Sequence, residues 1–212
     1  MSQGRTLATS IWRRTWLPVV NVACATFIGG GLAAPLLAKL GWRSAAEALY
    51  AAYHLTCHQW AFRSFFVFGQ QPVYAQDTLT DLGLDPFAFA GDSGLGWKMA
   101  FCERDLAIYT GVLLVGLYFA RRRELEPPNL GLYALLALPM ALDGFTQLFG
   151  WRESTWELRV LTGLLFGLGS AWLVLPHLEQ AFGKPEPSEQ YAPVEIEPCA
   201  PHPLPNRVLP PG

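Results

Sequence analysis

The sequence contains few charged residues. Lys, Arg, Asp and Glu make up 15% of its 212 residues, whereas a soluble domain carries about 25%. The formal net charge is −2, so the chain lacks the basic excess of a nucleic-acid-binding protein. Because 51% of the residues are hydrophobic, the composition indicates an integral membrane protein that contacts lipids and no nucleic acid.

Cysteine is also scarce. The four cysteines lie at scattered positions, 24, 57, 102 and 199, which is not the pattern of a small disulfide-stapled secreted protein. No two of them form a Cys-x-x-Cys pair. A thioredoxin-like redox protein is therefore a poor match.

Long uncharged runs are present. Residues 15–38 contain no charged side chain, and about 20 apolar residues suffice to cross a membrane. A cleaved signal peptide is the alternative, but the run is long for one and lacks a clear cleavage site. The expected helices are 15–38, 44–68, 98–120, 130–148 and 160–178. These runs predict an all-α integral membrane helical bundle with four full transmembrane helices plus one partial or fifth helix at 44–68.

The sequence divides into three parts. Residues 1–14 are expected to form a cytoplasmic N-terminal arm, 15–182 a transmembrane helical domain, and 183–212 a Pro-rich extended tail. Within the helical domain, 70–97 is expected to be an acidic loop, and a loop of that length is usually functional or docked on another part.

The arginines indicate a topology. Residues 121–123 are all Arg, and the N-terminal arm carries three more. If 44–68 does not span, all six lie on one side of the membrane, as the positive-inside rule favours. If 44–68 spans, the two groups lie on opposite sides. The first arrangement predicts a multi-pass protein of a bacterial cell (inner) membrane with both termini in the cytoplasm.

The spacing of His, Cys and Asp indicates a metal site. His54, Cys57 and His58 stand at i, i+3 and i+4, which would place them on one helical face. Cys102 and Asp105 are at i and i+3 of the next expected helix. Since the loop joins these two helices, the five side chains are expected at one bundle end. They are the usual ligand types for zinc or another transition metal.

Two other interpretations remain open for these residues. Cys57 and Cys102 could form a disulfide or a redox dithiol on an oxidising face. The polar side chains could instead form a purely structural network of Arg–Asp pairs.

Further polar residues are expected at the same bundle end, where ionisable groups are costly unless paired. They could orient metal ligands, bind an anionic lipid headgroup through arginine, or simply cap and pair the helix ends. Asp143 could also act as an acid or base. These candidates are Gln59, Arg63, Arg104, Asp143, Gln147, Arg152 and Arg159.

Three sequence blocks carry a family resemblance. They are His54-Leu-Thr-Cys57-His58-Gln59 with Arg63-Ser64-Phe65-Phe66, Cys102-Glu-Arg104 with Ile108-Tyr109-Thr-Gly111, and Asp143-Gly144-Phe-Thr146-Gln147 with Arg152-Glu-Ser154-Thr155, Arg159 and Thr162-Gly163. Over residues 45–182 the chain resembles the membrane protein family called domain of unknown function 2085. That family usually has a second Cys where this chain has Asp105. The third block is loosely similar to the VanZ-like family.

The resemblance implies a fold and a candidate site but no reaction, and whether the protein is an enzyme stays open. Three classes of function are predicted. The first is a membrane protein with a metal or thiol site. The second is an accessory subunit of a larger respiratory or photosynthetic complex, held by its tail and acidic loop. The third is a lipid-headgroup-binding or lipid-modifying protein that uses Asp143 and Arg152.

Overall fold

The structure, a computed structural model, describes the backbone of residues 2–183 and the side chains of Trp12 and of residues 15–182. The predicted tail 183–212 lies outside the described residues, apart from Gly183. The elements are α1 (Ser2–Lys39), α2 (Arg43–Tyr53), the 3-10 helix η1 (Ala61–Arg63), β1 (Phe66–Val67), α3 (Gln76–Asp81), β2 (Gly91–Asp92), β3 (Gly96–Lys98), α4 (Glu103–Arg121), α5 (Leu130–Leu148) and α6 (Trp156–Gly183).

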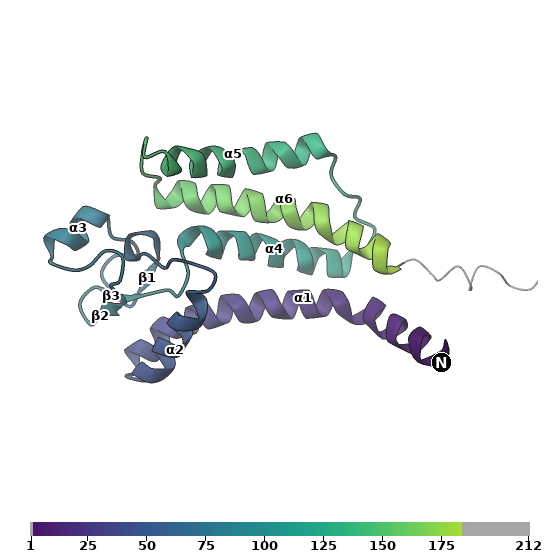
Figure 1. Cartoon of the computed structure of the whole chain (residues 1–212), viewed down its shortest axis with the longest axis horizontal. Coiled ribbons are helices and arrows are strands. Elements are labelled where there is room, and N and C mark those ends of the chain that lie inside the picture. The colour runs from purple at the N-terminus through teal and green to yellow at the C-terminus, as the bar shows by residue number, and fades with distance from the viewer. Residues whose placement is uncertain (1, 184–212) are drawn as a thin grey trace, which may run out of the picture.

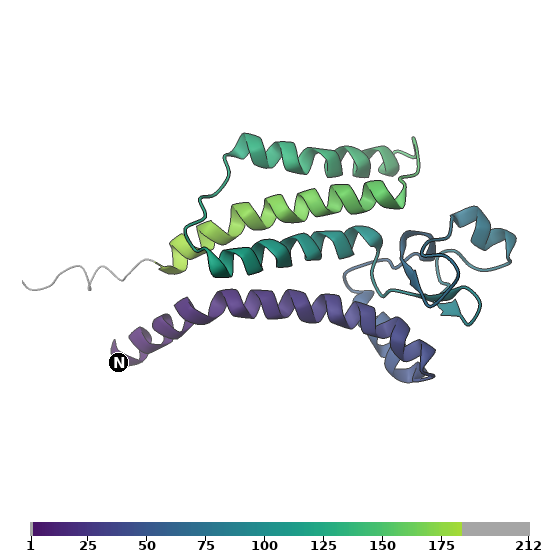
Figure 2. The same ribbon diagram turned by 180° about the vertical axis from the view of Figure 1, so that it is seen from behind.

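Four long helices lie side by side in the order α1, α4, α6, α5 (Figures 1 and 2). The N-terminus of α1 and the C-terminal ends of α4 and α6 lie at one end of the molecule. Helices α2 and α3 and the small sheet lie at the other end (Figure 1). The N-terminal part of α1 and residues 121–123, predicted to lie on one side, are therefore at the same end of the molecule.

Two of these helices are long and apolar enough to cross a membrane, at Thr15–Lys39 and Trp156–Phe182. The structure therefore supports two transmembrane helices rather than the four full ones predicted. Helix α4 begins with the charged residues Glu103, Arg104 and Asp105, and α5 carries Asp143 and Gln147 in its last two turns. These polar ends shorten the continuous apolar stretch in both helices.

Helices α4 and α6 share the most extensive helix contact among the described residues. A methyl group added at Gly167 of α6 would overlap the backbone carbonyl of Ile108, and one at Gly111 of α4 would lie 2.8 Å from the amide nitrogen of Leu168. Small residues let helix backbones approach within a membrane, where helix association relies on van der Waals packing. These glycines therefore set the spacing that aligns the first turns of α4 and α6.

The prediction of a helix over 44–68 is wrong beyond Tyr53, because α2 ends at that residue. The Thr56 hydroxyl donates to the Tyr53 carbonyl at 3.1 Å, and such local bonds compete with helix propagation. Gln59 then adopts a positive φ of 56°. The chain continues through η1 and β1 instead of a helix.

The acidic loop predicted at 70–97 folds into structure. Strand β3 pairs antiparallel with β1 and with β2, and Gly91 and Gly96 take positive φ angles at the hairpin. The segment packs with η1 and β1 around a core that includes the buried side chains of Phe62, Phe66 and Tyr74. The segment is thus a compact cap on the bundle end.

Further boundaries differ from the prediction, and α6 extends past the expected 160–178 at both ends. The helix expected from residue 98 begins at Glu103, because residues 96–98 pair in β3. The N-terminal arm expected at 1–14 is helical from Ser2 and continues into the first apolar stretch. Its cytoplasmic location stays a prediction.

Candidate functional site

Two thiols and a carboxylate meet at the N-terminus of α4. The sulfur atoms of Cys57 and Cys102 and a carboxylate oxygen of Asp105 all lie within 4.8 Å of one another. We call these three residues the thiol–carboxylate cluster. Both cysteines are free thiols and are partly buried.

Backbone hydrogen bonds hold the cluster together. Cys102 is the N-cap of α4, and its sulfur accepts a hydrogen bond from the Asp105 amide at 3.4 Å. The Cys102 amide donates to the sulfur of Cys57 at 3.3 Å. A helix N-terminus carries partial positive charge, which favours thiolate and carboxylate groups. The local fold thus suits anionic ligands.

The two thiols differ in acidity. A hydrogen bond from the Cys102 side chain lowers the pKa of Cys57. The same hydrogen bond, together with burial, raises the pKa of Cys102 well above its ordinary value. Cys57 is therefore the more acidic thiol of the pair.

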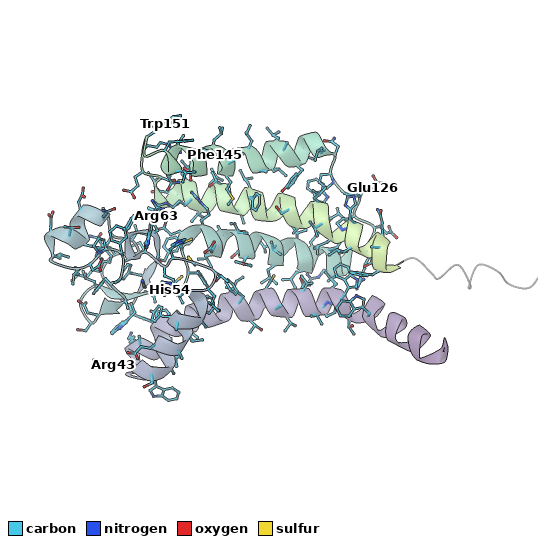
Figure 3. The ribbon with its side chains drawn as sticks, in the orientation of Figure 1. Arg43, His54, Arg63, Glu126, Phe145 and Trp151 are labelled. Atoms are coloured by element: carbon cyan, nitrogen blue, oxygen red, sulfur yellow. The ribbon has the colours of Figure 1, made fainter. Side chains whose placement is uncertain are left out.

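The two predicted histidine ligands do not join the cluster. His54 is the C-cap of α2, so it no longer shares a helical face with Cys57 and His58. Both imidazoles are exposed, and the His58 ring lies 5.6 Å from that of Trp60. Figure 3 shows His54 at the capped bundle end. The structure therefore brings together three of the five predicted metal ligands.

Gln59 and Lys98 form a buried hydrogen-bonded pair beside the cluster. The Gln59 side chain donates to the Tyr50 carbonyl at 2.7 Å, and its own backbone carbonyl accepts from the Lys98 ammonium. Tyr50 donates in return to the Lys98 carbonyl at 2.5 Å. Burial lowers the pKa of Lys98 to about 8. Gln59 thus ties α2 to β3, and its backbone also contributes to the lowered pKa of Cys57.

Asp143 is the centre of a second polar group. Its side chain is 2% exposed and accepts from Arg104, from Arg152 at 2.6 Å and from Gln147 at 3.0 Å. These bonds join α4, α5 and the turn after α5. The group thus contains Arg–Asp pairs of the kind expected in the structural-network alternative. Its members are Asp143, Gln147, Arg104 and Arg152.

Arg63 and Arg159 make separate ion pairs nearby. Arg159 donates to the buried carboxylate of Glu103 at 3.1 Å, and Arg63 lies 3.6 Å from Glu153. Arg63 lies at the capped end, opposite to Glu126 (Figure 3).

Sequence reasoning missed two residues of this region, Lys98 and Glu103. Lys98 was expected to begin a helix, although it is the one basic residue between Arg63 and Arg104. In the sequence, Glu103 stands out only as a member of the Cys102-Glu-Arg104 block. Its burial beside Arg159 depends on the α4–α6 contact, which no local pattern reveals.

The chain is similar to known proteins. The family described as "Predicted membrane protein (DUF2085)" matches residues 93–173, a span that holds Cys102, Asp105 and the Asp143 group but not Cys57. An uncharacterised protein of Methanocaldococcus jannaschii is 36% identical over 151 residues, covering 68% of this chain and 80% of the relative. One of Methanothermobacter thermautotrophicus is 44% identical over 86 residues, covering 39% of this chain and 78% of the relative. No solved structure matches the chain.

These matches support a membrane location and contact with lipids. Both relatives are archaeal, so the predicted bacterial inner membrane is not supported. The VanZ-like likeness, the accessory-subunit role and the lipid-modifying role stay predictions. This chain covers 80% of the Methanocaldococcus jannaschii protein at 36% identity. Together with the family match, this similarity shows that the chain belongs to the DUF2085 family of predicted membrane proteins.

Proposed function

We propose that this protein binds a zinc ion or a similar transition metal at the thiol–carboxylate cluster of Cys57, Cys102 and Asp105. One observation carries the proposal. Three ligand atoms from two separate segments lie within 4.8 Å of one another, although 45 residues separate the two cysteines.

The donor set fits zinc. Thiolate sulfur binds zinc at about 2.3 Å and carboxylate oxygen at about 2.0–2.2 Å, so three ligand atoms around one ion must lie within a few ångströms of each other. Two thiols also favour zinc over magnesium or calcium, which prefer oxygen ligands alone. Three protein ligands leave a fourth position open, where a bound zinc ion can activate water or polarise a substrate.

We further propose a multi-pass arrangement in which α1, α4, α5 and α6 all cross the membrane. Helices α4 and α5 have 19 residues each, or about 28 Å at 1.5 Å per residue, close to the thickness of the hydrocarbon core. Their polar ends then lie at the interface under the cap. Reporter proteins fused after residues 83 and 125 should face opposite sides of the membrane, because α4 lies between these two positions. The same side for both would overturn this topology.

The metal proposal is tested by metal analysis of the detergent-purified full chain. Wild-type protein should retain one zinc per chain, and Cys57→Ser or Cys102→Ser should lose it. Cys24→Ser is the matched control, because Cys24 is a free cysteine within α1 and outside the cluster. Absence of stoichiometric metal from wild type grown with zinc, copper or iron would overturn the proposal.

Asp105→Asn separates a metal site from a redox dithiol. A metal site needs the carboxylate, so the variant should release zinc while keeping both thiols. A redox pair needs only the two sulfur atoms. Unchanged metal content in Asp105→Asn, together with ready formation of a Cys57–Cys102 disulfide, would support the dithiol instead.

A further inference from the structure

Three guanidinium groups gather at the capped bundle end, where η1, α4 and α6 begin or end. Their side chains are 30%, 21% and 5% exposed for Arg63, Arg104 and Arg159. Two almost fully buried carboxylates, Glu103 and Asp143, lie among them. The other nearby acids, Glu153 and Glu157, are exposed to solvent.

Each of the three guanidiniums keeps a buried donor without an acceptor. Among the described residues, the Nε atoms of Arg63, Arg104 and Arg159 have no hydrogen-bond partner. Arg159 uses Nη1 for Glu103 at 3.1 Å and for the Phe62 carbonyl at 3.4 Å. A buried N–H group without an acceptor is destabilising, and a charged group more so.

Arg63 makes only weak contacts of its own. Its guanidinium lies 4.6 Å from the centre of the Trp60 ring and 3.6 Å from the Glu153 carboxylate. Burial lowers the pKa of Arg63, and so do the positive charges of Arg159 and Arg104. The guanidinium of Arg63 thus lies close enough to those of Arg159 and Arg104 to be repelled by them.

One acceptor in the same group also lacks a donor. The Oε1 atom of Glu103 is buried and has no partner among the described residues, while Oε2 accepts from Arg159. The group therefore offers three N–H donors and one carboxylate acceptor. A phosphate group matches this set, because guanidinium donors suit phosphate oxygens and a hydroxyl on the ligand can donate to the carboxylate.

We propose that Arg63, Arg104 and Arg159 bind the oxygens of a phosphate group, with Glu103 accepting a hydrogen bond from a hydroxyl of the same ligand. The site lies beside the Asp143 ion pairs and does not use the thiol–carboxylate cluster. It is therefore independent of the proposed metal function. The phosphate could belong to a soluble ion or to a lipid headgroup at the membrane surface.

The test measures the melting temperature of the full chain with two probes. Inorganic phosphate is compared with sulfate at equal ionic strength in detergent, since sulfate lacks the hydroxyl donor at neutral pH. Nanodiscs of phosphatidylcholine alone are compared with nanodiscs of equal parts phosphatidylcholine and phosphatidylglycerol. Stabilisation by phosphate above sulfate assigns a soluble phosphate, and stabilisation by phosphatidylglycerol alone assigns a lipid phosphodiester.

Arg63→Gln is the main variant, because Arg63 is partly exposed and its loss is tolerable for folding. The substitution should lower the affinity for the stabilising ligand by about tenfold or more. Arg63→Lys keeps the charge but not the Nε donor, so it should also weaken binding. Arg123→Gln is the matched control, since Arg123 pairs with Glu179 at 2.7 Å at the opposite end. Zinc content should not change in any of them.

Two results would overturn the proposal. One is the absence of stabilisation by either probe in wild type. The other is an equal loss of ligand response in Arg63→Gln and Arg123→Gln, which would indicate general charge attraction rather than a site.

Discussion

The amide nitrogen of Cys102 donates to the sulfur of Cys57 at 3.3 Å across 45 residues of chain. This bond connects the irregular segment after α2 to the N-cap of α4. It brings two thiols together although neither belongs to a Cys-x-x-Cys motif. Because Cys102 is fixed by the first turn of α4, the geometry of the cluster depends on where that helix begins.

Replacing Asp105 should change metal affinity in two directions. Asp105→Asn should weaken zinc binding by at least about tenfold, since loss of a hydrogen-bond partner outside the metal ligands already costs that much in known sites. Asp105→Cys should tighten binding, because it supplies a third thiolate ligand. Competition with a chromogenic zinc chelator measures both. Equal affinities in the two variants would contradict a role for residue 105 as a ligand.

Asp143→Asn should destabilise the protein strongly. The substitution leaves Arg104 and Arg152 beside a neutral side chain that is 2% exposed. Removing one member of a buried ion pair costs about 3 kcal/mol of unfolding free energy. Reversible unfolding in mixed micelles measures the change.

Glu179→Gln is the control for that experiment. Glu179 pairs with Arg123 at 2.7 Å, but both side chains are partly exposed. Loss of such a pair costs no more than about 1 kcal/mol. Similar losses in the two variants would show that burial of Asp143 does not set the strength of its ion pairs.

Gly167→Ala should separate α4 from α6. The added methyl group would overlap the Ile108 carbonyl, which is backbone and cannot rotate away. Overpacking of this kind costs about 1–3 kcal/mol. Gly144→Ala in α5 is the control, since a methyl group there meets nothing within 4 Å and alanine favours a helix by about 1 kcal/mol. Relative to wild type, the melting temperature should fall for Gly167→Ala and rise for Gly144→Ala.

Lys98 should make stability depend on pH. Burial lowers the pKa of Lys98 to about 8 in the folded protein, from 10.5 in its ordinary state. Between these values the unfolded chain binds more protons than the folded one, so the free energy of unfolding should rise as the pH increases from 8 to 10.5. The contribution is about 3 kcal/mol over that window.

Lys98→Met should abolish that slope. Unfolding is measured at several pH values in both proteins, and the difference between the two curves removes the effect of other titrating groups. The comparison uses the slope alone, since the variant also loses the hydrogen bond to Gln59. Parallel curves would mean that Lys98 titrates normally.

Local sequence patterns predicted the regular helices well. The uncharged run at 15–38 lies within α1, and the expected helix at 130–148 matches α5 to the residue. Polar side chains were also expected at one bundle end, and the described ones gather there. Such features depend on hydropathy and helical periodicity, which are properties of a short stretch of chain.

Local patterns failed where distant segments determine the structure. Residues 54–67 lie in a helix-like sequence, yet β1 pairs with β3 and pulls the chain out of the helix. His54 and His58 consequently leave the face on which the metal prediction placed them. The same pairing removes Lys98 from the expected helix and buries it.

By itself, the sequence determined that this is a membrane protein with long apolar helices and a polar end that contains Cys57, Cys102 and Asp143. Only the tertiary structure decided which of those polar residues meet. In the folded chain Asp105, and neither histidine, lies beside the two cysteines. Asp143 pairs with two arginines. The physical reason is that hydropathy acts within a segment, whereas burial, strand pairing and hydrogen bonding of charges depend on segments far apart in the chain.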